Sequence, residues 1–203
     1  MKLFYKAGAC SLASHIALRE VGAEFQLEAV DTQRKMTETG TDYRSINPKG
    51  YVPALVIGSD VLTEGAAILQ FIADTHPLSN LAPDVGTIPR ARLQEHLNYV
   101  ASELHKAFGP FFRDDTTEKQ KEYAAHAVAT KFDYIETLLS DDRSYLLGDG
   151  FTVADAYLFV VANWANFVGI DLKSWPYLAS FVERVAARPA VQDAMVAEGL
   201  TEQ

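Results

Sequence analysis

The sequence predicts two domains, an α/β domain at the N-terminus and an all-helical domain at the C-terminus. Three observations predict this fold class. Strand-like and helical patterns alternate up to about residue 76, the next segment is rich in Pro, Gly, Ser and Asn, and every later segment repeats its apolar residues at helical spacing. We therefore expect an α/β domain over 1–77, a linker over 78–89 and a helical domain over 90–203.

The α/β domain has the element order βαβ followed by ββα. Apolar runs bounded by turn residues predict strands at 3–5, 25–29, 54–57 and 61–62, and helical spacing predicts helices at 12–21 and 66–75. The turn Gly58-Ser59-Asp60 joins the last two strands as a hairpin. A short helix is also expected at 42–46.

The second domain begins with a helix whose apolar residues run from Leu93 to Phe108, and a second helix follows at 118–139. The segment Thr152-Val153-Ala154-Asp155 is typical of a capping box, in which the Asp155 carboxylate accepts the Thr152 amide proton. The helix that it starts, 156–167, is apolar almost all round and should be the buried centre of this domain. Two further helices follow Trp175-Pro176 and Arg188-Pro189.

Composition excludes several function classes. A chain of 203 residues with 48% hydrophobic residues has too much to bury for a disordered protein, and no apolar run approaches the length of a membrane helix. The net charge of −9, without a block of Lys or Arg, argues against nucleic acid as a partner. No secretory signal is evident at the start, so we expect a cytoplasmic protein.

Cys10 is the only cysteine, which excludes an intramolecular disulfide and a multi-cysteine metal cluster. No His, Asp or Glu set has metal-ligand spacing, and we predict no metal. Cys10 directly precedes the first helix, where backbone amides and the helix dipole stabilise a thiolate. A small buried apolar cysteine is the other interpretation, and its position leaves both open.

Two further loop segments, at the same end of the predicted sheet as Cys10, contain candidate ligand-binding residues. If the Val52-Pro53 bond is cis, the Val52 backbone can face an extended peptide-like ligand, although an ordinary proline at a strand entry fits the pattern equally. Glu64 and Gly65 precede a helix. Glu64 is either an acid favoured by the helix dipole or a carboxylate that grips a ligand's ammonium group while nearby amides bind its carboxylate.

A polar stripe follows the first helix of the second domain. Asn98, Ser102, His105 and Lys106 lie at intervals of four, three and one, beside an apolar face. Such a stripe is often only the solvated side of a helix. Here His105 and Lys106 are adjacent and could supply positive charge or a proton donor to a thiolate.

At these residues the sequence resembles the bacterial beta-class glutathione transferases. The resemblance runs over nearly the whole chain in the segments MKLFYKAGACSLASHIALRE, NPKGYVPAL, LTEGAAILQFIAD, LNYVASELHKAF, FTVADAYLF and ARPAVQDAMVAEGL. It implies a thioredoxin-like N-terminal domain, an all-helical C-terminal domain, a homodimer and glutathione bound as a co-substrate in the cleft, with no prosthetic group.

The resemblance also assigns roles to residues. Cys10 would interact with the thiol, approached by His105 and Lys106, and Lys35 would meet the glycine carboxylate of glutathione. Val52, before a cis-Pro53, would pair with the cysteinyl backbone. Glu64 and Gly65 would bind the γ-glutamyl group. A further group of residues matches family positions that include contacts across the dimer interface: Asn98, Ser102, Glu103, Leu104 and His105.

One position departs from the family pattern. Many glutathione transferases carry Ser after the acid, where this chain has Gly65. A charge-assisted hydrogen bond is worth about 1.5 to 3 kcal/mol, so the resemblance implies weaker glutathione binding than is usual.

The expected activity is conjugation of glutathione to small hydrophobic electrophiles, together with thiol–disulfide exchange or peroxide reduction through Cys10. A non-catalytic binding protein for hydrophobic molecules is the alternative, with its site built from the aromatic residues of the helical domain: Tyr99, Phe108, Phe111, Phe112, Trp164 and Phe167. A third class, an interaction module that no longer binds glutathione, is disfavoured because Cys10, Lys35, Glu64, His105 and Lys106 are all present.

Overall fold

The computed structural model describes residues 1–201, so that 202–203 of the predicted helical domain lie outside the described residues. Contacts divide the chain into two compact units, one containing residues 1–82 and the segment from 187 onward, the other containing 83–186. The division after residue 82 falls within the predicted linker. The segment from 187, which the sequence groups with the helical domain, instead packs with the α/β unit because its apolar residues Val191 and Ala194 are buried there.

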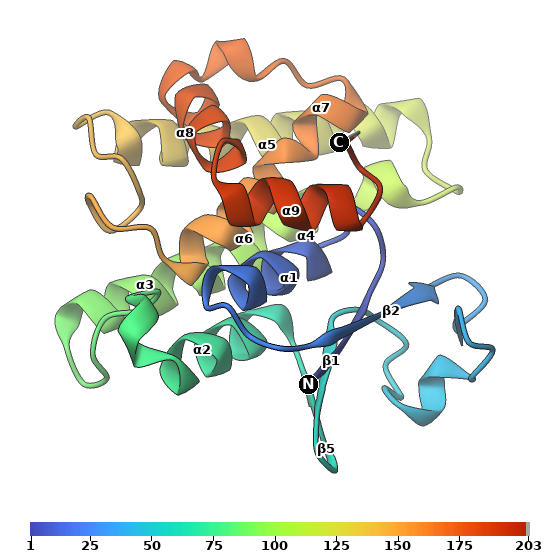
Figure 1. Ribbon diagram of the computed structural model, residues 1–203. Helices are drawn as coiled ribbons and strands as arrows, with labels where there is room; N and C mark the ends of the chain where they lie inside the picture. Colours follow the sequence, from blue (N-terminus) through green and yellow to red (C-terminus); the bar gives the residue numbers. More distant parts are fainter. Residues whose placement is uncertain (202–203) are drawn as a thin grey trace. The chain divides into compact units, whose positions relative to one another are not determined.

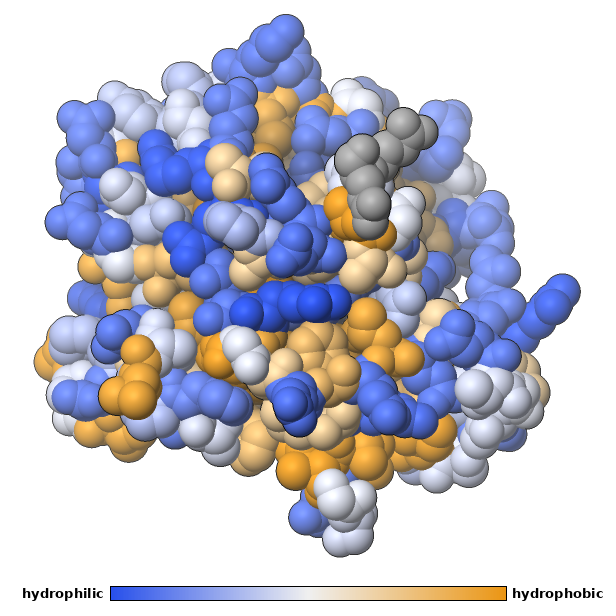
Figure 2. Space-filling model, viewed as in Figure 1, coloured by the Kyte–Doolittle hydropathy of each residue, from blue (hydrophilic) through white to orange (hydrophobic). Residues whose placement is uncertain are grey.

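A five-stranded sheet of order β3-β2-β1-β4-β5 forms the α/β unit. Strands β1 and β2 are parallel, and the other neighbours are antiparallel. The strands are β1 (Lys2–Tyr5), β2 (Gln26–Asp31), β3 (Met36–Thr37), β4 (Ala54–Ile57) and β5 (Asp60–Thr63). The sequence does not predict β3, because two residues are too few to show a strand period. Figure 2 shows apolar atoms around the β4–β5 hairpin at the bottom of the view, where Val61 is 43% exposed.

Helices cover one face of this sheet, and a buried tyrosine covers the other. Helix α1 (Ser11–Glu20) contacts both α2 (Gly65–Thr75) and α9 (Pro189–Ala197), and α9 lies beside α1 in Figure 1. On the opposite face, Tyr43 packs against the strand residues Phe4, Val30 and Ala54. Tyr43 belongs to a 3-10 turn, Tyr43–Ser45, at the position of the predicted short helix.

The second unit is helical. Its longer helices are α3 (Ile88–Tyr99), α5 (Glu118–Leu139), α6 (Val153–Asn163) and α8 (Pro176–Ala186), with the short helices α4 (His105–Ala107) and α7 (Ala165–Val168). Short 3-10 turns occur in this unit at Gly109–Phe112 and Leu172–Ser174, and another occurs in the first unit at Pro77–Ser79. The predicted burial of the central helix is confirmed, since residues 153–162 of α6 are all buried. Within residues 1–201, no helix is long and apolar enough to cross a membrane.

The structure differs from the predicted helices at two points. The predicted helix ending near Phe108 is interrupted by a π-helical turn at Val100–Leu104, between α3 and α4. The central helix ends at Asn163, and α7 begins after Trp164. Neither break contains Pro or Gly, so the composition carries no signal of them. The predicted carboxylate bond of the capping box is present, because Asp155 Oδ2 accepts the Thr152 N–H at 2.8 Å.

Candidate functional site

Three candidate segments leave the sheet at the same edge of the α/β unit. Phe4 of β1 pairs with Ala54 of β4, and Ala54 pairs with Thr63 of β5. The loop after β1, the Val52–Pro53 entry into β4 and the residue after β5 therefore lie together. This register explains how residues more than 50 positions apart can form one site.

Cys10 lies at the start of α1, one residue before Ser11. It is half-buried, which argues against a residue that only fills the core. Its Sγ lies 3.5 Å from the Val52 carbonyl oxygen and donates to it. Two effects on the thiol oppose each other, because donation to a carbonyl favours the protonated form and the helix start favours the thiolate.

The Val52-Pro53 peptide bond is cis, as the resemblance implies. Val52 precedes β4 and stands outside its ladder. Its carbonyl faces Cys10, and its N–H donates to no group among residues 1–201. Pro53 is buried. The Val52 backbone is thus open to a ligand with an extended peptide backbone.

Lys35 approaches the same segment from the turn between β2 and β3. Its Nζ donates to the Gly50 carbonyl at 3.0 Å and lies 5.4 Å from the centre of the Tyr51 ring. Lys35 has a positive φ of 58°, and a Cβ at Gly50 would lie 3.1 Å from its Cδ. The glycine therefore allows the lysine stem to lie against the backbone just before Val52.

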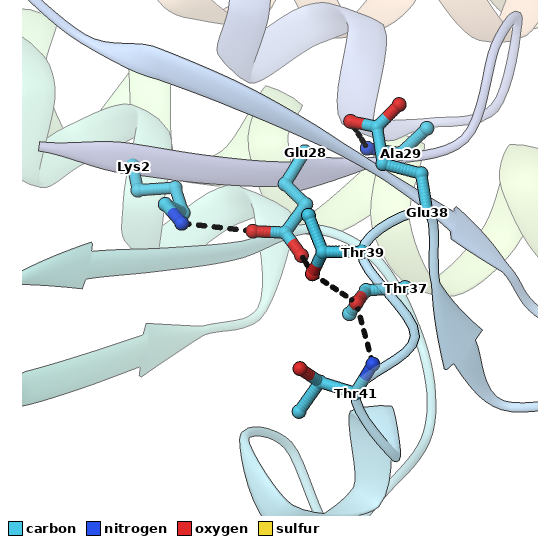
Figure 3. A network of polar contacts seen from close by, with 7 residues as sticks. All are labelled: Lys2, Glu28, Ala29, Thr37, Glu38, Thr39 and Thr41. Carbon is cyan, nitrogen blue, oxygen red and sulfur yellow. Dashed lines mark hydrogen bonds and ion pairs between the residues drawn. The ribbon is translucent and has the colours of Figure 1, made fainter.

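A polar network anchors the hairpin that carries Lys35 (Figure 3). Glu28 of β2 receives the Lys2 ammonium at 2.8 Å on one oxygen and the Thr39 hydroxyl at 2.5 Å on the other. Thr37 continues the network to Thr39 and accepts the Thr41 N–H. Burial of Glu28 opposes ionisation, but the bonds from Lys2 and the threonines prevail and lower its pKa. The ionised form therefore holds the network together at neutral pH.

Glu64 follows β5 and precedes α2, which begins at Gly65. Its φ of 70° is unusual for a residue with a side chain, and such backbone outliers cluster at ligand sites. The Glu64 side chain is 71% exposed and forms an ion pair with Lys49. The amides of Gly65 and Ala66 lie in the first helical turn, where N–H groups lack helical acceptors. The Glu64 carboxylate is therefore adjacent in the chain to the Gly65 and Ala66 amides at the start of α2.

The structure gives the residues of the predicted polar stripe different environments. Asn98, Ser102 and Glu103 are exposed, the Ser102 hydroxyl donates to the Asn98 carbonyl at 2.8 Å, and Glu103 pairs with Lys131 at 2.6 Å. Leu104 is fully buried, so only its backbone could contact a ligand. A π-helical turn at Val100–Leu104 lies between Asn98 and His105, so the α-helical spacing from which the stripe is predicted does not continue through this segment.

His105 contacts Tyr157 and Trp164, and its neighbour Lys106 is exposed. The His105 Nδ1 lies 2.9 Å from the Tyr157 hydroxyl, and its ring lies edge-on to Trp164 with centroids 4.8 Å apart. Burial, with a smaller effect from the Lys106 charge, lowers the pKa of His105 to about 4. His105 is therefore neutral at pH 7, and only Lys106 of this pair is a cation.

Tyr157 and Trp164 belong to the predicted apolar helix 156–167, and nothing in the sequence pattern connects them with His105. The available signal is chemical, because a buried Tyr hydroxyl normally finds a hydrogen-bond partner. Among residues 1–201, no group of three or more His, Cys, Asp or Glu side chains could hold a metal ion.

Comparison with known proteins places these features in a family. Residues 7–75 match the N-terminal domain of glutathione S-transferases, and residues 99–189 match their C-terminal domain. The chain is 49% identical over 201 residues to glutathione S-transferase GstA of Escherichia coli O157:H7, covering 98% of this chain and 100% of the relative.

Solved structures agree with the sequence comparison. The bacterial beta class glutathione S-transferase of Sphingomonas chungbukensis superposes with a TM-score of 0.95 at 46% identity, covering 99% of this chain and 100% of that one. A sphingomonad glutathione S-transferase complexed with glutathione gives the same TM-score, identity and coverage.

Proposed function

Because the chain belongs to the bacterial beta class of glutathione S-transferases, we propose that its α/β unit binds glutathione and that the enzyme transfers it to small hydrophobic electrophiles. The observation that carries this proposal is the 3.5 Å contact between Cys10 Sγ and the Val52 carbonyl. It joins the candidate thiol-interacting residue to the backbone expected to hold the cysteinyl part of glutathione.

Each part of glutathione has a chemically suitable group at the shared sheet edge. The ammonium group of the γ-glutamyl residue would replace Lys49 on Glu64, and its carboxylate would accept the Gly65 and Ala66 amides. The cysteinyl backbone would pair with Val52, as strands pair at a sheet edge. The glycine carboxylate would bind the Lys35 ammonium, which leaves the Gly50 carbonyl.

Conjugation requires the glutathione thiol to lose its proton and attack the electrophile. With a chloronitrobenzene, a carbon–sulfur bond forms, chloride leaves with the bonding electrons, and the thiol proton passes to solvent. We propose that the helical unit contributes Lys106 as a cation and His105 as a neutral hydrogen-bond donor. His105 donates from Nε2 when the Tyr157 hydroxyl donates to its Nδ1.

Cys10 would add a second activity that uses disulfides or peroxides. With a glutathione-containing disulfide, the Cys10 thiolate forms a mixed disulfide and expels a thiolate. With a peroxide, it becomes a sulfenic acid as an alcohol leaves, and glutathione then forms the mixed disulfide with loss of water. In both routes a further glutathione releases Cys10 and forms glutathione disulfide, so reduction of a peroxide consumes two glutathione molecules and reduction of the glutathione-containing disulfide consumes one.

The variant Cys10→Ala separates the two activities. We expect it to retain part of the conjugating activity towards a chloronitrobenzene and to lose thiol–disulfide exchange, with an unchanged circular dichroism spectrum. Loss of both activities in a folded variant would contradict this division.

Glutathione binding is tested by calorimetry with two ligands. Lys35→Met should weaken glutathione binding about 10- to 100-fold, the equivalent of one charge-assisted hydrogen bond. It should change the affinity for γ-glutamylcysteine, which has no glycine carboxylate, much less. Lys119→Met is the matched control, since Lys119 also lies over a tyrosine ring, that of Tyr123. Equal losses for both ligands would contradict the assignment of Lys35.

The γ-glutamyl contact is tested at the start of α2. Glu64→Gln should weaken glutathione binding, and Glu118→Gln, at the start of α5 and paired with Lys121, should not. Gly65→Ser should strengthen binding by restoring a hydroxyl donor. Binding that is unchanged in both site variants would place the γ-glutamyl group elsewhere.

Two further properties follow from the family and remain proposals. We propose a homodimer, in which Asn98 and the 102–105 segment contribute to the glutathione site, and a cytoplasmic location. Analytical ultracentrifugation tests the first, and cell fractionation the second. A monomer with full glutathione affinity would contradict the dimer contribution.

Exposed aromatic residues in the helical unit support a second candidate function, the binding of hydrophobic molecules. Phe112 and Phe167 of the helical unit are 55% and 69% exposed, and Phe112 contacts Trp164. These side chains could hold hydrophobic molecules without turnover, whereas Phe108 is fully buried and cannot. Binding of an apolar dye in the absence of any conjugating activity would favour this alternative.

A further inference from the structure

Tyr43 is a buried polar residue that lies outside the proposed contacts with glutathione. Its side chain is fully buried, and its ring lies 5.6 Å from that of Phe4. Burial raises the pKa of Tyr43 to about 12, so its hydroxyl stays protonated at physiological pH. A core position of this kind needs only a phenyl ring, and a hydroxyl there requires a partner.

The partner is the backbone next to Val52. The Tyr43 hydroxyl donates to the Tyr51 carbonyl at 2.9 Å, and the Asn47 side-chain amide donates to the same oxygen at 2.7 Å. Asn47 is 98% buried, since only 2% of it is exposed. The Tyr43 N–H also donates to the Lys35 carbonyl at 2.8 Å. Tyr43 thus bonds to both segments that are proposed to hold glutathione.

Because the peptide unit is planar, the contact at the Tyr51 carbonyl also determines the direction of the Val52 N–H. The Tyr51 carbonyl and the Val52 N–H belong to one trans peptide plane, in which they point in opposite directions. Two donors occupy the two lone pairs of the carbonyl oxygen and so fix the plane. The Val52 N–H, which has no acceptor among residues 1–201, is consequently aimed away from the Tyr43 hydroxyl.

We propose that Tyr43 is a positioning residue for glutathione binding, whose hydroxyl, together with Asn47, orients the Tyr51–Val52 peptide so that the Val52 N–H meets the cysteinyl backbone. This inference rests on the proposed function, because Val52 is a glutathione contact only there. The new element is that a buried hydroxyl orients the Tyr51–Val52 peptide plane.

The variant Tyr43→Phe removes this hydroxyl and keeps the ring. Asn47 then remains the only side-chain donor to the Tyr51 carbonyl, and the plane can turn about it. We expect the Kd of glutathione, measured by calorimetry, to rise about three- to tenfold, the scale of one neutral hydrogen bond. The Kd of γ-glutamylcysteine should rise at least as much, because its cysteinyl carboxylate still offers the Val52 N–H an acceptor oxygen at this position. The KM of the electrophile should not change.

Thr75→Val is the matched control in the same unit. It also removes one hydroxyl that donates to a backbone carbonyl, that of Phe71 at 2.7 Å, near the end of α2 opposite Glu64. The control should leave both glutathione constants unchanged. A rise of less than twofold in Tyr43→Phe, or an equal rise in the control, would overturn the proposal.

A second measurement does not depend on glutathione. The ¹⁵N order parameter of the Val52 amide should fall in Tyr43→Phe from the rigid-backbone value of about 0.85 towards 0.6, and should not fall in Thr75→Val. An unchanged order parameter would overturn the orienting role even if glutathione binding were weaker. If the wild type did not bind glutathione, the proposed function would fail, whereas the order parameter would still decide the role of Tyr43.

Discussion

Replacing Glu198 by Leu tests the buried hydrogen-bonded pair that ties the C-terminal segment to the loop before Cys10. Both side chains of the pair, Glu198 and His15, are fully buried in the α/β unit, with Glu198 Oε1 at 3.0 Å from His15 Nδ1. The other carboxylate oxygen accepts the Gly8 N–H at 3.0 Å. Glu198→Leu has a similar volume and removes both acceptors.

The expected loss of stability follows from the two bonds. A buried polar group deprived of its partner costs about 1 to 3 kcal/mol, and the half-buried Gly8 N–H costs less than the buried His15 ring, so the free energy of unfolding should fall by about 1 to 4 kcal/mol. His15 keeps its contact with Arg19 through Nε2, at 3.3 Å, which favours the lower part of this range. Since domains are stable by only about 5 to 15 kcal/mol, the loss should be easily measured.

Urea unfolding followed by far-ultraviolet circular dichroism measures this loss. Tryptophan fluorescence alone is unsuitable, because Trp164 and Trp175 both belong to the helical unit. Glu198→Gln is the control, since its amide oxygen can still accept the His15 Nδ1 proton while only the bond to Gly8 is lost, and it should lose less than Glu198→Leu. A loss below about 0.5 kcal/mol in Glu198→Leu, or equal losses in the two variants, would refute the reasoning.

Three further predictions concern titrating groups. Burial raises the pKa of Asp155 to about 6, against bonds from Leu146 and Thr152, so the folded state binds its proton more tightly than the unfolded state. Between about pH 4 and 6, the stability of the wild type should therefore fall relative to Asp155→Asn as pH rises, by up to about 3 kcal/mol in urea titrations. The pKa of Glu28 is lowered, so the ionised Glu28 carboxylate stabilises the folded state above about pH 4.5. This stabilisation should be lost as the pH falls below 4.5. Glu28→Gln, which has no carboxylate, should not show that loss of stability. His105, with a pKa of about 4, should give a neutral-imidazole ¹⁵N spectrum throughout pH 5 to 8, and an imidazolium spectrum at pH 6 would contradict its buried environment.

Helix and strand positions were largely predictable where local chemistry determines them. The helix expected over 118–139 has those bounds in α5, because Thr117 caps its start and apolar residues recur along one face. The cis bond before Pro53 agrees with the family resemblance. The π-helical turn at Val100–Leu104 was not predictable, because a change of hydrogen-bond register leaves the composition unchanged.

The candidate site was predictable as a set of residues but less so as a geometry. The sequence names Cys10, Lys35, Val52 and Glu64 as candidates, yet the contact of Cys10 with Val52 joins positions 42 apart and has no signal in the sequence. Tyr43 was missed because its hydrophobic ring fits a core pattern, and the hydroxyl gains a role only through Tyr51. The same π-helical turn interrupts the α-helical spacing from which the stripe of Asn98 to His105 is predicted.

By itself, the sequence determined the fold class, the family and the residue types available for binding glutathione, since periodicity, capping and motif order are local properties of the chain. Only the tertiary structure decided the protonation and the orientation of those residues. His105 is neutral because Tyr157 and Trp164 bury it, and Val52 presents its N–H because Tyr43 and Asn47 hold the preceding carbonyl. Desolvation and hydrogen-bond direction depend on neighbours far along the chain, and folding alone brings those neighbours together.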